Sequence, residues 1–447
     1  MNEMVRRILN GGAMSLEEIV SEEIRVFRRS AQYGRMREAE QYYLNRSDVQ
    51  NKQNEVAGRS NTKIEHPFLK RLVDQKVNYL LASPWSVQTA EPRYAEALSA
   101  LFDFPFRQKL RSLGRCAVKS GIAWLQPFFD EGRLSFVCLP PTEVVPLWHD
   151  EEHGRLDGFI RFYEQTVYEG RMERCVLRAE LWDKSGVRHF KAPPGSDALG
   201  PDPEREGIQP HFTVSGRGYN WEEAPLVWVR YNDEELPLCY FIKELIDDYN
   251  WQSSVTADVL RDVAKFVYVL KNYGGQDLAE FITDLKNHLA IKVSDNGGVD
   301  KLQAELNIDA VMAFLDKQRR DLYDFAAAVD TKDPALGGAS GTAINFRYMD
   351  LDADCRGLAL ELQAAFGRLK GFIDVYLQLS GAGDFHGTGF EIVFNADMPV
   401  NEAEIVESVA RLAGSRVVAS RRTLVGQLPF VRDVEAEMKE LEREGSL

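Results

Sequence analysis

The sequence of 447 residues contains only five cysteines, and no two of them form a CxxC pair. This scarcity excludes a disulfide framework and a cysteine-rich zinc site, and it favours reduced thiols in a protein core. No stretch approaches the about 18 uncharged apolar residues of a membrane span, and the N-terminal segment lacks the apolar run of a signal peptide. We therefore expect a protein that is neither exported nor inserted into a membrane.

An excess of basic residues is also missing, since 54 Lys and Arg face 69 Asp and Glu, for a formal net charge of -15. Phosphate binding needs clustered cations that release counterions, so this balance argues against a general nucleic-acid binder. A local basic cluster exists at Lys63, Lys70, Arg71 and Lys76, which we interpret as a solvated helix face. The 44% of hydrophobic residues suffices for a large core.

Motifs of catalysis and metal binding are scarce as well. His149 and His153 have the spacing of two metal ligands on a helix, but Pro146 before them and Gly154 after them predict an exposed hairpin turn instead. The stretch LGGASGTA lacks the Lys and the upstream buried strand of a phosphate-binding P-loop. We therefore expect no catalytic residue, no metal site and no cofactor.

The longest stretch without Gly or Pro runs from Leu238 to Tyr273 and has apolar residues at helical spacing. At about 1.5 Å per residue such a helix would reach roughly 50 Å, which usually requires a partner. A second helix is predicted from Asn307, a suitable N-cap, to near Val329. Between them lies a mixed insert with a short helical run and a strand-like segment, Leu289 to Val293.

The stretch DTKDPALGGASG, Asp330 to Gly341, interrupts the helical pattern with Pro334 and three glycines, which predicts a mobile loop. Thr342 restarts a helix whose apolar positions step by four and three, as in a seam against another helix. Three glycines lie inside this helix, at Gly357, Gly367 and Gly371. They predict a bend or very close helix contacts.

The flanking regions predict a mixed architecture. Ser15 and Glu18 form a capping box at the start of a helix, and Arg46 to Ser60 is interpreted as an exposed connection. From Ala117 to Val229, apolar runs separated by turn residues predict an antiparallel β-meander. Within it, Gly195 to Gly207 is rich in Pro, Gly and charge and predicts a mobile loop.

The C-terminal region begins with a glycine-rich link, followed by a short predicted strand from Phe390 to Phe394. Asn401 and Glu404 predict the cap of a further helix, and Pro429 separates two more helical segments. Helices and antiparallel strands thus occupy different parts of the chain, which places the fold in the α+β class.

Several long blocks resemble the portal proteins of long-tailed, siphovirus-type bacteriophages. The blocks read NTKIEHPFLKRLVDQKVNYLLASP, LIDDYNWQSSVTADVLRDVAKFVYVLKNYGG, GGASGTAINFRYMDLD and MPVNEAEIVESVARLAGSRVVASRRTLVGQLPFVRDVEAEMKELERE. The resemblance extends over about the whole chain, although 155–227 carries no motif that aligns with the family.

This resemblance implies a multi-domain portal fold with long stem helices, an antiparallel β-rich wing, a mixed clip and a helical crown. The implied parts are a wing (1–236), a first stem helix (237–272), a clip (273–307), a second stem helix (308–329), a tunnel loop (330–341), a long bent wing helix (342–380) and a crown (381–447).

The function implied by the resemblance is that of a ring-shaped channel at one capsid vertex, a homo-oligomer expected to be a dodecamer. DNA would be packaged through it by the terminase motor and later ejected. The implied partners are the terminase large subunit, a head-completion or adaptor protein, capsid and scaffolding proteins, and double-stranded DNA in the pore. The protein would belong to the virion and assemble in the cytoplasm of a host bacterium.

Two groups of candidate site residues follow from the implied layout. Those of the tunnel loop in the DNA channel are Thr331, Lys332, Asp333, Pro334, Gly337, Gly338, Ser340 and Gly341. Those of the clip, for partner docking, are Lys286, Asn287, His288, Lys292, Asp295 and Asn296.

The alternative is a non-pore capsid scaffolding or coiled-coil structural protein, which would explain the long helices but not the glycine-rich loop between two of them.

Overall fold

The computed structural model describes residues 14–53, 60–214, 216–262, 267–271, 277, 279, 298–302, 307–334, 341–394, 402–413, 420–426, 428, 431, 434–443 and 445. The chain forms two compact units. The larger unit comprises Met1–Leu44, Leu69–Phe241 and Tyr323–Leu447, and the smaller comprises Asn45–Phe68 and Ile242–Leu322.

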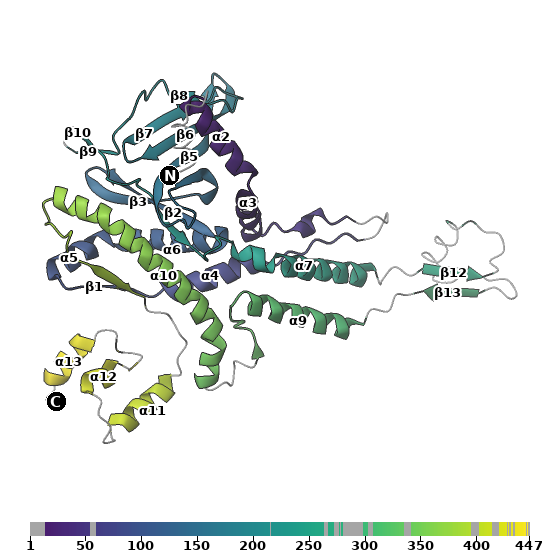
Figure 1. Cartoon of the computed structure of the whole chain (residues 1–447). Helices are drawn as coiled ribbons and strands as arrows, with labels where there is room; N and C mark the ends of the chain where they lie inside the picture. Colours follow the sequence, from purple (N-terminus) through teal and green to yellow (C-terminus); the bar gives the residue numbers. More distant parts are fainter. Residues whose placement is uncertain are drawn as a thin grey trace. The chain divides into compact units, whose positions relative to one another are not determined.

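Helices open the larger unit (Figure 1). They are α2 (Leu16–Arg29), α3 (Ala31–Tyr43), α4 (Phe68–Leu81, whose first residue lies in the smaller unit), α5 (Pro92–Leu101) and α6 (Phe104–Ser120). The predicted capping box is confirmed, because the Ser15 hydroxyl accepts from the Glu18 N–H and the Glu18 carboxylate accepts from the Ser15 N–H. Helix α2 buries Ile24 and Phe27 in the same apolar cluster as Phe159 and Phe162 of a sheet.

The predicted antiparallel meander is confirmed. Its strands are β2 (Ile122–Asp130), β3 (Arg133–Leu139), β4 (Val144–Trp148), β5 (Leu156–Glu169), β6 (Met172–Asp183), β7 (Gly186–Lys191), β8 (Gly200–Pro201), β9 (Phe212–Val214), β10 (Arg217–Tyr219) and β11 (Val227–Arg230). They form sheets in the orders β4-β5-β6-β7-β8, β11-β2-β3 and β10-β9. Between β2 and β3, Glu131 (φ 48°) and Gly132 (φ 82°) form a two-residue turn of the kind that closes hairpins.

The segment from Gly195 to Gly207, predicted to be a mobile loop, is mostly exposed but is attached to the rest of the unit at two buried residues. Leu199 is buried, and the fully buried carboxylate of Asp202 accepts a 2.6 Å hydrogen bond from Arg178 of β6. Composition does not reveal this partner, and the mobility of the other residues stays a prediction.

The third predicted long helix is α10 (Gly341–Leu379), which Figure 1 shows as one continuous, curved helix. Its buried residues contact helices α4, α5 and α6, as in the Cys355 cluster with Tyr79, the Asp374–Tyr94 hydrogen bond and the Phe366–Phe106 ring contact. It also contacts strands β11, β3 and β14 (Phe390–Val393), so the seam expected against another helix is shared between helices and strands. Among the described residues, a Cβ at any of its three internal glycines would meet no other atom within 4 Å, so the alternative of very close helix contacts is not seen there. Strand β14 confirms the predicted short strand and pairs with β1 (Ser86–Thr89).

The remaining helices of the larger unit are α11 (Glu402–Ala413), α12 (Arg421–Gly426) and α13 (Val434–Arg443). Helices α12 and α13 flank the position of Pro429, as predicted, while Asn401 itself lies outside the described residues.

The smaller unit contains most of α7 (Leu238–Asp262) and α9 (Ile308–Phe325), with strands β12 (Val267–Lys271) and β13 (Gly298–Leu302) paired antiparallel. The Asn307 cap is confirmed, because its side chain accepts from the Ala310 N–H at 3.1 Å. The first helix ends at Asp262 rather than near Tyr273. Residues 267–269 are Val, Tyr and Val, and such β-branched and aromatic residues favour a strand over a helix.

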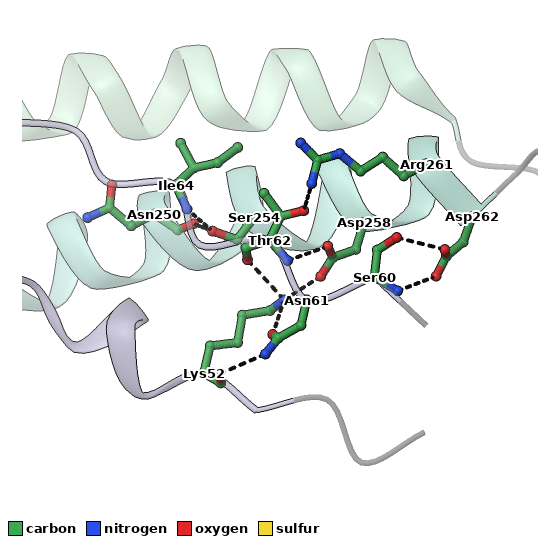
Figure 2. Close-up of polar contacts among 10 residues, drawn as sticks. All are labelled: Lys52, Ser60, Asn61, Thr62, Ile64, Asn250, Ser254, Asp258, Arg261 and Asp262. Atoms are coloured by element: carbon green, nitrogen blue, oxygen red, sulfur yellow. Dashed lines mark hydrogen bonds and ion pairs between the residues drawn. The ribbon is translucent and has the colours of Figure 1, made fainter. Parts of the chain in front are cut away.

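An extended segment, residues 60–66, runs along α7 in the smaller unit, and we call it the strap (Figure 2). Four backbone N–H groups of the strap donate to α7 side chains: Ser60 to Asp262 (3.1 Å), Thr62 to Asp258 (2.7 Å), Ile64 to Ser254 (2.9 Å) and His66 to Asn250 (3.1 Å). Every second strap residue thus meets every fourth helix residue. The two spacings agree because two residues of an extended segment advance about 6.6 Å and four residues of a helix advance about 6 Å.

A buried ion pair fixes the strap near its centre. The Lys52 ammonium bonds the Asp258 carboxylate, and both side chains are almost inaccessible to water. Lys52 also donates to the Thr62 carbonyl at 3.3 Å. Residues 46–60 were predicted to be an exposed connection, but the described part contains the short helix η1 (Asp48–Asn51) and the buried Lys52, so that prediction was wrong.

The charge of Asp258 determines whether the protein gains or loses stability as the pH falls. Burial raises the pKa of its carboxyl, but the hydrogen bonds from Lys52 and Thr62 outweigh burial and leave this pKa below its ordinary value of 3.8. The pair therefore contributes stability above that ordinary pKa, and the stability is lost as the pH falls through the lowered pKa.

Asp258→Asn should loosen the strap, because it keeps the side-chain shape but leaves the Lys52 ammonium buried without a counter-charge. We expect a loss of about 3 kcal/mol in the free energy of unfolding and faster amide hydrogen exchange in residues 60–66. Hydrogen–deuterium exchange with mass spectrometry measures the second effect. Glu244→Gln, on an exposed position of the same helix, is the control. Equal exchange in both variants would contradict the role of the pair.

Candidate functional site: the loop before helix α10

The candidate tunnel loop was predicted from Asp330 to Gly341. Helix α9 already ends at Phe325, and the residues that follow belong to the larger unit. Ala327 has φ 45°, a left-handed conformation that ends the helical run. The chain then continues to Pro334, and α10 begins at Gly341, one residue before the predicted restart.

Helix α4 contacts residues 327–331, which end the predicted second stem helix and begin the predicted loop, and we call them the loop base. The Gln75 amide binds both backbone groups of Val329, donating to its carbonyl at 2.8 Å and accepting from its N–H at 3.1 Å. Arg71 donates to the Thr331 hydroxyl at 3.0 Å and lies 3.9 Å from the Asp330 carboxylate. Asp330 and Thr331 thus contact Arg71 of α4, and the mobility of the predicted loop stays a prediction.

Lys76 is the most buried charge at this site, with a side chain that is 0% exposed. Its ammonium donates to the Ala327 carbonyl at 3.0 Å and to the Asp354 carboxylate of α10 at 2.8 Å. The Tyr231 hydroxyl donates to the same carboxylate at 3.1 Å, and burial, followed by the charge of Asp354, raises the pKa of Tyr231 so that it stays a donor. A solvated helix face, as predicted for the basic cluster, is therefore wrong for Lys76.

The outer part of the loop is more exposed. Lys332 and Pro334 are exposed, and Asp333 forms an ion pair with Arg347 of α10 in which both side chains are more than a third accessible. Such a surface pair contributes little, in the range of about 0–1 kcal/mol.

Several predicted site residues lie outside the described residues. These are Gly337, Gly338 and Ser340 of the loop and the clip candidates Lys286, Asn287, His288, Lys292, Asp295 and Asn296.

The two histidines with metal-like spacing lie in the turn between β4 and β5, as predicted. His149 Nδ1 is 3.0 Å from Asp157, whereas His153 Nδ1 is 2.6 Å from Glu235 and its ring stacks on Trp148. The two rings thus bind different carboxylates. Within the described residues no group of three or more His, Cys, Asp or Glu could hold a metal ion, and no helix in that part of the chain is long and apolar enough to cross a membrane.

Comparisons with known proteins support the resemblance seen in the sequence. The family model described as "Phage portal protein, SPP1 Gp6-like" matches residues 28–446. The portal protein of Bacillus phage SPP1 is 30% identical over 416 residues, which cover 90% of this chain and 82% of that protein. The portal protein of Clostridium phage phiCD119 is 24% identical over 422 residues, covering 89% and 90%.

Among solved structures, the chain is similar to a protein in the neck of a native gene transfer agent particle computed with C12 symmetry. The TM-score is 0.43 at 14% identity, covering 81% of this chain and 89% of that one. A chain of the virion of the native gene transfer agent gives a TM-score of 0.45 at 13% identity, covering 95% and 98%. Because the family model matches nearly the whole sequence and the SPP1 relative is 30% identical over most of it, this chain belongs to the SPP1-like family of phage portal proteins.

Proposed function

We propose that this portal protein assembles into a closed homo-oligomeric ring at one vertex of a phage capsid and forms the channel through which double-stranded DNA is packaged and later ejected. The family match over residues 28–446 is the observation that carries the proposal. It also disfavours the alternative of a non-pore scaffolding or coiled-coil protein.

Exposed apolar side chains on the long helices support assembly. Large apolar residues on α7, α9 and α10 are about half exposed or more in the single chain: Trp251, Leu260, Met312, Phe325, Phe346, Met349 and Leu360. Burial against neighbouring subunits would remove these side chains from water, which favours assembly.

The charge of the chain suits a channel that DNA must slide through. Each subunit has a formal net charge of -15. An acidic surface repels phosphates and disfavours the multiple contacts that would stall the DNA.

The role is structural rather than enzymatic, as it is for the family. The terminase large subunit and a head-completion adaptor would dock on the clip (273–307), and capsid and scaffolding proteins would surround the ring in the assembling particle.

Assembly is the first test. Purified protein should form a closed ring of about twelve subunits, because the exposed apolar faces of the long helices need partners. Light scattering gives the mass, and negative-stain imaging shows whether a central hole exists. A strictly monomeric mass across salt and protein concentration would refute the proposal.

If partners dock on the clip, reversing the charge of its lysines should weaken their binding. Lys286→Glu combined with Lys292→Glu should leave the ring intact yet weaken binding of the terminase motor, measured by stimulation of its ATPase. Lys317→Glu, the same change on the exposed surface of α9, is the matched control. Normal stimulation by the double variant would argue against docking through these residues.

If the tunnel loop must move during packaging, proline substitutions in it should impair packaging. Gly337 and Gly338 permit backbone conformations closed to other residues, so replacing both by Pro should restrict the loop and impair DNA packaging while ring assembly persists. Packaged DNA is measured as nuclease-protected DNA in capsids. Gly357→Ala is the control, since a Cβ there meets open space. If the double variant packages full-length DNA at the normal rate, loop mobility is not part of the mechanism.

A further inference from the structure

The hairpin of β5 and β6 is longer than the sheet that contains it. Strand β4 pairs with β5 only as far as Arg161, and β7 pairs with β6 only from Arg178 onward. Beyond these points, residues 164–175 form a two-stranded ribbon, which we call the arm, and within the described residues its strands pair only with each other. From Glu164 to Glu169 the arm advances about 17 Å before it turns back.

The arm is exposed in the single chain. Its described side chains are all exposed except that of Val167, which is half-buried. Near the tip, Tyr168 is 74% exposed and Met172 is 61% exposed. A two-stranded ribbon is only marginally stable in water by itself, and exposed apolar side chains favour burial against a second surface. The arm therefore gains stability when another surface covers its tip.

A groove lies at the root of the arm. It has a volume of about 430 Å³ and lies between α2, β6 and the segment before β8. The buried side chains of Ile24, Leu177 and Leu199 form its apolar part. Leu177 pairs with Glu164, the first residue of the arm, and the Glu164 carboxylate lies 3.6 Å from Arg28 of α2. The groove and the tip of the arm are thus separated by about the length of the arm.

The arm and the groove carry complementary charges. On the arm, Arg171 and Glu173 are exposed and form no ion pair with any described residue. At the rim of the groove, Arg29 and Asp197 are also exposed and without an ion pair in the part of the chain that the structure describes. Each surface therefore offers one cation and one anion, and the two surfaces of different copies can form two ion pairs.

We propose that the arm of one subunit docks in the α2 groove of the neighbouring subunit. Tyr168 and Met172 then pack on the apolar part of the groove, while Glu173 faces Arg29. This inference deepens the proposed ring and rests on it. A copy displaced by about the length of the arm presents its own groove to the arriving tip, so the contact is head-to-tail, and its repetition forms a ring when the rotation closes.

Charge reversal and mixing test the contact. Glu173→Arg on the arm and Arg29→Glu on the groove each bring like charges together at every contact of a ring. For each variant alone, the protein concentration at which half the subunits are in rings should rise about tenfold, measured by light scattering on dilution. Co-expressed in equal amounts, the two variants should form rings as stable as those of the unchanged protein, because in an alternating ring every arm meets the opposite charge.

Lys184→Glu is the control, since Lys184 is exposed in the turn at the other end of β6. If both single variants assemble as the unchanged protein does, the arm is not part of the interface and the inference is overturned. Weakened rings that co-expression does not restore would overturn the groove as the docking site. Restoration would show that the contact joins different chains. Absence of rings in the unchanged protein would instead refute the proposed function itself.

Discussion

The buried ammonium of Lys76 is the constraint on which the centre of the larger unit depends. Removing a charge from water costs several kcal/mol unless it is paired and hydrogen-bonded, so this side chain must keep its partners in place. Those partners are a carbonyl just after α9 and a carboxylate of α10, residues about 250 and 280 positions later in the chain. Helix α4 therefore cannot pack correctly unless Ala327 and Asp354 are both correctly placed, which couples the loop base to the core.

In both units, side chains of a helix hold a neighbouring segment of the chain. A segment without a strand partner must still satisfy its backbone N–H and carbonyl groups, and in both cases the side chains of an adjacent helix do so. The strap uses four α7 residues spaced by four, ending at Asp262, whereas the loop base uses successive α4 residues, Gln75 and Lys76. Such contacts fix an extended segment without creating a sheet edge that could pair with another chain.

Local signals in the sequence predicted local structure well, and the resemblance predicted the family that the comparisons confirm. The Ser15 capping box, the Asn307 cap and the meander depend on residues close together in the sequence. Burial of Lys52 and Lys76 was not predicted, because it depends on partners more than 200 positions away. Glycine and proline mark where a helix must end, but no local pattern shows which side chains of α4 contact the residues that follow.

The basic cluster illustrates how internal contacts engage cations that lie close together in the sequence. Lys63 binds the Gln50 carbonyl, Lys70 the Asp74 carboxylate, Arg71 the Thr331 hydroxyl, and Lys76 the Asp354 carboxylate. Each cation is thus directed to a group of its own chain, and the carboxylates of Asp74 and Asp354 partly neutralise Lys70 and Lys76. Sequence clustering therefore overstates the phosphate-binding capacity of this region. A channel protein that combines a net negative charge with internally engaged cations can keep DNA mobile while still using positive charge to hold its own loop in place.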